Sequence, residues 1–282
     1  MIDKIDIALA LRAAGIETGD TVFLNCSLWK FGAVFAKSSD DMQRLYYDTI
    51  RDVLGSSGTI VVNSQTTHLT RSGEPFVVEE TSTEGGGFSE FIRTKPGAVR
   101  SCHPVVSMTA LGPKAEDICG RKHASGYGYF SPCAVLLELN AKIVSLGTGY
   151  GHHSTSFQHF LEQMYGVPYQ YTKIFDIAVY MNNKRVEGPF TLNVRYPNFG
   201  ISYDAIPFRR SLVDRDLANL VSLGRGEIFS IPASVFFREG MNALSKNRYA
   251  FCSEVPKFEY GKIPFDGPVE SSRTGVKSLA KE

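Results

Sequence analysis

Residues 143–168, IVSLGTGYGHHSTSFQHFLEQMYGVP, decide the expected fold of this chain. An apolar run that ends at Leu146 is followed by three glycines, by polar residues and then by a helical pattern. This order predicts a strand, a glycine-rich turn and a helix with Ser156 as its N-cap. A helix that begins just past the carboxyl end of a strand lies where α/β sheets place their ligand crevices.

Two chemically active residues, His159 and Glu162, lie three positions apart in the predicted helix. Residues at this spacing share one helix face, so the two side chains can meet. A carboxylate beside an imidazole fixes its tautomer and raises its basicity, as a general base requires. The spacing therefore favours a catalytic His159–Glu162 pair, although a solvated surface pair has the same spacing.

The histidines are crowded in sequence, since His152, His153 and His159 fall within eight residues. We regard His152, His153, Ser156 and His123 as candidate substrate contacts, with the alternative that the first two are only turn residues. A zinc site is the rival interpretation of this crowding. Adjacent histidines are a poor geometry for one metal, and neither C-x-x-C nor H-E-x-x-H occurs, so we expect no metal.

The composition is that of an ordinary globular protein, since 43% of the 282 residues are hydrophobic and 21% are charged. No apolar run approaches the roughly 20 residues that span a bilayer, and acidic residues interrupt the N-terminal apolar stretch, unlike in a signal peptide. Five cysteines without close pairing predict reduced thiols and a cytoplasmic location. The basic residues are dispersed, which argues against a nucleic-acid partner, and a net charge of +1 argues against attraction of strongly cationic substrates.

The first half of the chain alternates helical and strand patterns. Helices are predicted at 3–14 and 40–54 and strands at 21–24 and 59–62, an order that favours a mostly parallel sheet with both faces covered. Residues 63–87 are expected to form a long loop. Short helices at 88–95, 113–118 and 132–139 and a strand at 105–111 follow.

The pattern changes after residue 168. Antiparallel strands are predicted at 175–181, 185–186 and 191–194, with Asn182-Asn183 as a hairpin turn. A helix at 212–223, a strand at 227–230 and a helix at 232–244 complete the pattern. We therefore expect a catalytic α/β portion at 1–168, a smaller α+β portion at 169–262 on the acceptor side, and a flexible tail at 263–282.

Several segments resemble the aminoglycoside 3-N-acetyltransferase family, in the family's order along the chain. They are GDTVFLNCSL (19–28), GTIVV (58–62), PGAVRSCHPVVSMTALGPKAEDI (96–118), the His123…Gly126…Ser131-Pro132 loop, LGTGYGHHSTSFQHFLE (146–162) and, more faintly, GRGEIFSIPASVFFREGMNAL (224–244). The resemblance implies a three-layer α/β fold, with a mixed sheet and helices on both faces, distinct from the common GCN5-related acetyltransferase fold.

The resemblance also implies an enzyme that transfers an acyl group from an acyl-CoA co-substrate to an amine of an amino sugar. His159 matches the catalytic histidine and Glu162 its partner. The loops at 25–29, 100–104 and 131–132 match segments that line the coenzyme, and the residues concerned are Ser27, Leu28, Trp29, Arg100, Ser101, His103 and Ser131.

Physical chemistry leaves alternatives for these coenzyme candidates. Ser27 and Ser131 are equally suited to cap helices, and His103 to satisfy a strand end. Trp29 is suited to the core, whereas Arg100 is suited to a coenzyme phosphate. Backbone N–H groups of residues 25–28 are candidate oxyanion donors.

The expected acceptor departs from the family. After residue 166 the chain carries dispersed basic residues in place of an acidic substrate region, which would favour an anionic acceptor. The prediction is therefore a nucleotide-linked amino sugar of polysaccharide biosynthesis, with aminoglycoside modification as the alternative. A non-catalytic ligand-binding relative and a hydrolase using Cys26 or Cys102 are further alternatives. We expect small-molecule partners without nucleic acid or membrane, and a homodimer is left open.

Overall fold

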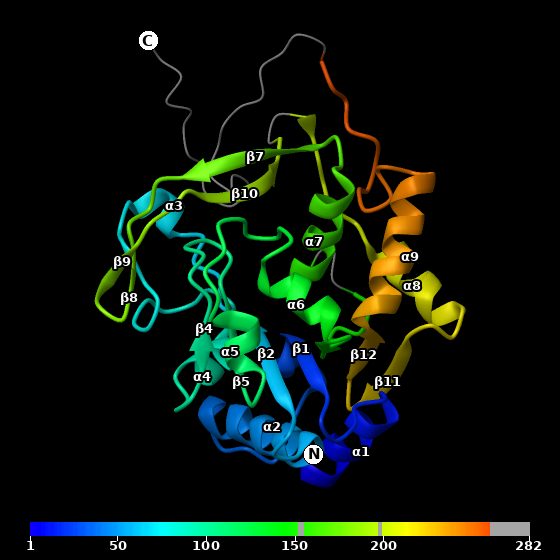
Figure 1. Cartoon of the computed structure of the whole chain (residues 1–282). Coiled ribbons are helices and arrows are strands. Elements are labelled where there is room, and N and C mark those ends of the chain that lie inside the picture. Colours follow the sequence, from blue (N-terminus) through cyan, green and yellow to red (C-terminus); the bar gives the residue numbers. More distant parts are fainter. Residues whose placement is uncertain (152–154, 197–198, 260–282) are drawn as a thin grey trace.

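The computed structural model describes residues 1–151, 155–196 and 199–259. Its centre is a seven-stranded sheet (Figure 1) whose three middle strands run parallel: β6 (Lys142–Leu146), β1 (Thr21–Cys26) and β2 (Thr59–Asn63). Antiparallel strands flank them on both sides. The outer strands are β5 (Met108–Leu111) and β4 (Val99–Arg100) beyond β2, and β12 (Gly226–Pro232) and β11 (Asn219–Leu223) beyond β6.

Alternation along the central strands produces two separate cores. In β1, Val22 and Leu24 lie in one hydrophobic cluster, and the intervening Phe23 lies in the other. Because successive strand side chains point to opposite faces, each face of the sheet is apolar and requires a covering layer. The predicted three-layer α/β fold is confirmed.

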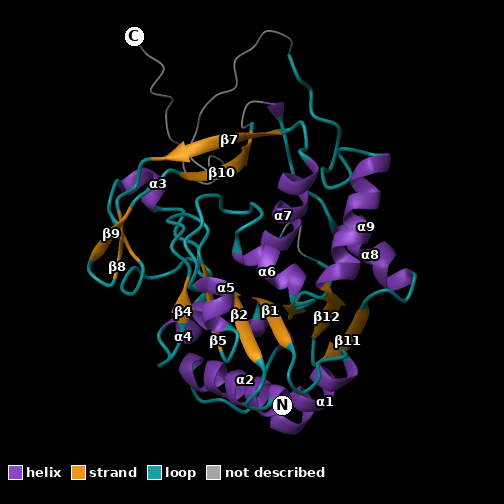
Figure 2. Ribbon diagram, in the orientation of Figure 1, coloured by secondary structure: helices purple, strands orange, loops and turns teal. Residues whose placement is uncertain are grey.

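Helices cover both faces, as Figure 2 shows. One face is covered by α1 (Lys4–Ala13), α2 (Ser39–Leu54), α4 (Gly87–Arg93) and the short 3-10 helix η1 (Leu28–Phe31). The opposite face is covered by α5 (Ala115–Cys119), α6 (Pro132–Glu138), α7 (Ser156–Tyr165), α8 (Ile206–Asp214) and α9 (Ala233–Lys246).

Two small sheets lie outside the seven-stranded sheet (Figure 1), one at the top of the view and one at its left. In the first, β7 (Gln170–Phe175) pairs with β10 (Phe190–Arg195); the second contains β3 (Phe76–Val77), β8 (Val179–Met181) and β9 (Lys184–Val186). The β8–β9 hairpin turns at Asn182 and Asn183, whose φ angles of 51° and 58° suit a type I′ turn. The predicted hairpin is therefore confirmed.

Three sequence predictions about the fold are wrong. The sheet is mixed, as the family resemblance implied, and not mostly parallel, as the alternation of helices and strands implied, because four of its six strand pairings are antiparallel. Residues 212–223 do not form one helix, because α8 ends near Asp216, which adopts a left-handed φ of 55°, and β11 follows. Residues 63–87 are not a plain loop, since they contain β3 and α3 (Leu69–Ser72).

The portion after residue 168 shares both a sheet and a core with the portion before it. Its strands β11 and β12 complete the seven-stranded sheet, and one core cluster contains residues from both sides of residue 168. The predicted tail at 263–282 lies outside the described residues. Among the residues that the structure describes, no helix is long and apolar enough to cross a membrane.

Candidate active site

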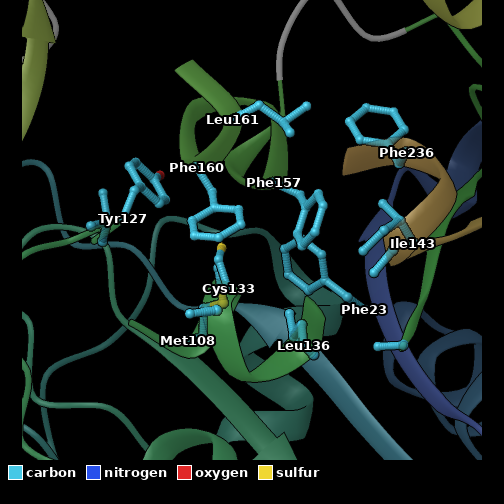
Figure 3. Close-up of a cluster of buried hydrophobic side chains, with 14 of the residues drawn as sticks. Phe23, Met108, Tyr127, Cys133, Leu136, Ile143, Phe157, Phe160, Leu161 and Phe236 are labelled. Atoms are coloured by element: carbon cyan, nitrogen blue, oxygen red, sulfur yellow. The ribbon is translucent and has the colours of Figure 1, made fainter. Parts of the chain in front are cut away.

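The helix α7 is held firmly against the core. Figure 3 shows Phe157 and Phe160 directed from α7 toward the buried side chains around the sheet and α6, and the Phe157 and Phe236 rings lie 5.9 Å apart. The N-cap is Thr155, not the predicted Ser156: the Thr155 hydroxyl accepts from the Gln158 N–H at 3.4 Å. Rigid packing of one face fixes the direction of the side chains on the other.

The predicted His159–Glu162 contact is present on α7. His159 Nδ1 donates to Glu162 Oε2 at 2.7 Å. The Glu162 side chain is 0% exposed, whereas that of His159 is 23% exposed. Because a carboxylate can only accept, Nδ1 carries a proton, and in the neutral imidazole the lone pair is then on Nε2. The pair is therefore not the solvated surface pair of the alternative interpretation.

Three further donors surround the Glu162 carboxylate. Tyr169 donates its hydroxyl to Oε1 at 2.9 Å, Gln158 Nε2 donates to Oε1 at 3.3 Å, and Gln170 Nε2 donates to Oε2 at 2.8 Å. Burial, and then the charge of Glu162, raise the pKa of Tyr169, so this hydroxyl stays protonated as a donor. The buried carboxylate is thus solvated by neutral protein groups and by His159.

Aromatic rings hold the His159 imidazole on two sides. The Tyr203 ring meets it edge-on at 5.0 Å between centroids, and the Tyr127 ring lies 5.7 Å away. Burial raises the pKa of both tyrosines, which keeps them neutral. The rings restrict the imidazole plane, so Nε2 is presented in one direction.

A chain of polar side chains joins α7 to the carboxyl edge of the sheet. Ser156 Oγ donates to Asn63 Oδ1 at 2.7 Å, and Asn63 Nδ2 donates to Asn25 Oδ1 at 3.1 Å. Asn25 and Asn63 lie at the ends of β1 and β2. Ser156 was predicted as a substrate contact; the structure uses its hydroxyl to join helix and sheet.

Arg100, which was expected to meet a coenzyme phosphate, is instead surrounded by protein acceptors. It is 6% exposed, and its guanidinium donates to the backbone carbonyls of Ser64, Val78 and Thr81 and to Ser107 Oγ. A coenzyme phosphate would have to replace these bonds. Arg100 therefore holds the 63–87 segment against β4, and the sequence did not predict this.

The neighbouring Ser101 and His103 are also enclosed. The Ser101 hydroxyl accepts from the Met108 N–H at 3.0 Å. His103 Nδ1 accepts backbone N–H groups, and Nε2 donates to the Thr191 carbonyl at 3.0 Å. Burial lowers the pKa of His103 to about 3, so it is neutral. This environment matches the strand-end alternative for His103.

His123 stacks on His103, with 5.9 Å between ring centroids. Its Nδ1 donates to the Ser125 carbonyl at 2.9 Å, and burial lowers its pKa. His123 is 3% exposed, so protein encloses it in this structure, and its role as a substrate contact stays a prediction. His152 and His153, the other predicted contacts, lie outside the described residues.

The remaining coenzyme candidates differ in exposure. Trp29 is 70% exposed, so the core alternative for it is wrong, whereas Leu28 is buried in the core. Ser27 and Ser131 occupy the N-cap positions of η1 and α6, yet neither side chain makes a capping hydrogen bond. Ser131 Oγ is buried and has no hydrogen-bond partner among the described residues.

Burial disfavours thiol chemistry at this site. Burial raises the pKa of Cys26 and of Cys102, which disfavours the thiolate that a nucleophile needs. The part of the chain that the structure describes contains no group of three or more histidine, cysteine or acidic side chains suited to hold a metal ion.

Sequence reasoning missed Tyr127, Tyr169, Gln170 and Tyr203. Tyr169 and Gln170 follow the end of α7 directly, but neither residue type carries a motif. Tyr203 reaches the site from a segment 44 positions after His159, and only the tertiary fold brings it there.

Comparisons with known proteins agree with this architecture. Residues 23–245 match the family model described as aminoglycoside 3-N-acetyltransferase. Aminoglycoside N(3)-acetyltransferase III of Salmonella sp is 28% identical over 182 residues, which cover 57% of this chain and 60% of the relative. Aminoglycoside N(3)-acetyltransferase VII of Streptomyces paromomycinus is 28% identical over 165 residues, which cover 52% and 56%. The chain thus spans about three-fifths of the length of the curated relatives it matches.

Solved structures share the fold. The structure of AAC-IIIb with CoASH has a TM-score of 0.74 at 20% identity and covers 90% of this chain and 99% of its own. AAC-VIa bound to sisomicin has a TM-score of 0.72 at 23% identity and covers 87% and 98%. The YokD protein from Bacillus subtilis has a TM-score of 0.71 at 20% identity and covers 87% and 94%. Since the family model spans most of its length, this chain belongs to the aminoglycoside 3-N-acetyltransferase family.

Proposed function

We propose that the protein transfers an acetyl group from acetyl-CoA to an amine of an aminoglycoside-type amino sugar, with His159 as general base and Glu162 as its orienting partner. The observation that carries the proposal is the buried Glu162 carboxylate 2.7 Å from His159 Nδ1, which leaves the Nε2 lone pair on a partly exposed ring. Among proteins of similar fold, AAC-IIIb was solved with CoASH.

The proposed reaction is a direct transfer. The amine of the acceptor is an ammonium near neutral pH and must lose a proton before it attacks. Nε2 of His159 takes this proton, and the free amine then forms the nitrogen–carbon bond to the thioester carbonyl. The tetrahedral intermediate expels the coenzyme sulfur as the carbon–sulfur bond breaks, a second proton passes from the amine nitrogen to that sulfur, and the imidazolium releases its proton to solvent. Glu162 stabilises the imidazolium between these steps.

The acceptor class rests on the relatives and on the pairing of the basic residues. The curated relatives are named aminoglycoside N(3)-acetyltransferases, and AAC-VIa was solved with sisomicin; the comparisons do not support the expected nucleotide-linked amino sugar. The charge argument for an anionic acceptor weakens because Arg215 pairs with Glu239 at 2.9 Å and Arg209 donates to the Tyr150 carbonyl. Arg215 thus serves an ion pair and Nε of Arg209 an internal hydrogen bond, whereas the two terminal nitrogens of Arg209 are buried without a hydrogen-bond partner among the described residues.

The coenzyme is proposed to lie along the carboxyl ends of β1 and β6. Ser27 follows β1 directly and its backbone N–H donates to the Leu146 carbonyl at the end of β6, so this loop is fixed beside the sheet. Trp29, exposed on the same loop, offers a face to an apolar or aromatic part of the coenzyme. Arg100, Ser101 and His103 are omitted from this proposal because their polar atoms already have protein partners.

Free-thiol release from acetyl-CoA tests the proposal. The protein is incubated with acetyl-CoA and either kanamycin-like amines or nucleotide-linked amino sugars, with His159→Ala and the surface variant His68→Ala as a matched control. We expect release with the aminoglycosides, loss of release in His159→Ala, and wild-type rates in His68→Ala. Release with nucleotide sugars alone would overturn the acceptor class, and full activity of His159→Ala would overturn the role of the histidine.

A further inference from the structure

Gln170, the first residue of β7, uses one amide group to connect two sides of the site. Its Nε2 donates to Glu162 Oε2 at 2.8 Å and to the Tyr203 hydroxyl at 3.0 Å. An amide nitrogen has two protons, so these bonds use both. The Glu162 oxygen that Gln170 contacts is the one that accepts the hydrogen bond from His159 Nδ1–H.

Tyr203 touches the other member of the catalytic pair. Its ring meets the His159 imidazole edge-on, 5.0 Å apart and inclined by 60°. The segment that carries Tyr203 is pinned by a β-bridge to Cys252 and by the Asp204 N–H, which donates to the Phe251 carbonyl at 2.9 Å. Its ring position is therefore set by the fold and not by the solvent.

The orientation of the Gln170 amide directs its N–H groups to Glu162 and Tyr203. Its carbonyl oxygen is buried and has no hydrogen-bond partner among the described residues. An unsatisfied buried acceptor costs about 1–3 kcal/mol. Rotating the amide would instead place this oxygen against the Glu162 carboxylate. The observed orientation is therefore the one that keeps both donors on Glu162 and Tyr203.

We propose that Gln170 and Tyr203 form one positioning unit for the catalytic pair, an inference that rests on the proposed function. Gln170 fixes the Glu162 oxygen that orients His159, and Tyr203 fixes the plane of the imidazole. The hydrogen bond between them links these two restraints, so the loss of either weakens the other. Neither residue needs to contact the acceptor.

Other charged and titratable groups lie around His159 and Glu162 and would contribute to any pH dependence of the reaction. Tyr127 faces His159 from the loop before α6, and Tyr169 faces Glu162. The Arg195 guanidinium lies over the Tyr203 ring, 5.4 Å from its centroid, and Cys252 lies close enough to Glu162 to be affected by its charge. The variants below leave all four groups in place.

The test uses Gln170→Met, Tyr203→Phe and the double variant. Gln163→Met is the matched control, because Gln163 lies on α7 but its amide donates to Ser125 Oγ and not to Glu162 or Tyr203. We expect kcat to fall about 10- to 100-fold in Gln170→Met and about 5-fold in Tyr203→Phe, with the acceptor KM unchanged. The double variant should be no slower than Gln170→Met, because both act through one unit.

A second readout does not depend on turnover. The Nδ1–H proton of His159 should give a strongly deshielded NMR signal, because it is bonded to a carboxylate, and the signal should move in Gln170→Met but not in Gln163→Met. Additive losses of kcat, an effect confined to KM, or an unmoved signal would overturn the positioning role. Full activity in His159→Ala would overturn the proposed function instead. The NMR comparison of Gln170→Met with Gln163→Met would still show whether Gln170 positions Glu162 and His159.

Discussion

Glu162→Gln tests how much the buried charge contributes to the reaction. The substitution keeps the shape of the side chain and an oxygen that can accept from His159 Nδ1, but it removes the negative charge. At an effective dielectric constant of about 20, unit charges about 3 Å apart attract each other by roughly 5–6 kcal/mol. Part of this stabilisation of the imidazolium survives in the neutral hydrogen bond. We therefore expect kcat to fall about 1,000-fold, which corresponds to roughly 4 kcal/mol in the barrier.

The structure predicts that this variant folds. The new amide group can donate to Gln158 Oε1, which has no hydrogen-bond partner among the described residues, and the Tyr169 hydroxyl can turn to accept. The free energy of unfolding should thus change by less than about 2 kcal/mol.

Steady-state thiol release with acetyl-CoA and an aminoglycoside gives kcat, and urea unfolding gives stability. Glu239→Gln, which alters an exposed ion pair with Arg215, is the control for the same chemical change elsewhere. A folded Glu162→Gln protein whose kcat lies within about 10-fold of wild type would refute the electrostatic argument.

Three further predictions concern stability. Arg100→Met leaves the Val78 and Thr81 carbonyls without their side-chain donor and removes one of the two donors to the Ser64 carbonyl. The free energy of unfolding should therefore fall by about 3–5 kcal/mol in urea titrations, and an unchanged value would remove Arg100 as the support of residues 63–87. Burial lowers the pKa of His103 to about 3, so between about pH 6.5 and pH 3 the unfolded chain binds a proton that the folded protein does not. The free energy of unfolding should therefore be highest above about pH 6.5 and fall as the pH falls toward 3. In urea unfolding, His103→Gln should flatten this dependence. Gly147→Ala puts a Cβ 2.2 Å from the Ser27 carbonyl oxygen at a φ of +99°, whereas the control Gly73→Ala, at a φ of +69°, has nothing within 4 Å of its Cβ. In thermal unfolding, Gly147→Ala should therefore lower the Tm more than Gly73→Ala does. Equal losses of Tm would show that the contact with Ser27 is unimportant.

Local patterns predicted the helix that carries His159 and Glu162. A three-residue spacing implies contact only if the helix forms and its face is sheltered, and both conditions follow from the apolar positions of α7. The partners of Glu162 were not predictable, because Tyr169 and Gln170 acquire their role from a chain reversal after Gly166. Gly166 adopts a left-handed φ of 76° that ends the helix and returns the chain toward Glu162.

The errors have physical causes. Leu212 to Leu223 has apolar residues at helical spacing, but pairing of β11 with β12 outweighs that local pattern. Arg100 was read as a phosphate ligand because a guanidinium suits anions, yet backbone carbonyls of a distant segment use the same donors. The sequence contains no sign of which acceptors a buried arginine will meet.

The pH dependence of His159→Ala tests the central claim most directly. If His159 removes a proton from the acceptor ammonium, the variant should depend on the free amine already present in solution, whose fraction rises about tenfold per pH unit below the amine pKa. We predict that kcat of His159→Ala at saturating acceptor rises steeply from about pH 7 to about pH 9, so that its deficit relative to wild type shrinks by at least about tenfold. A deficit that stays constant across this range would contradict the role of His159 as the general base.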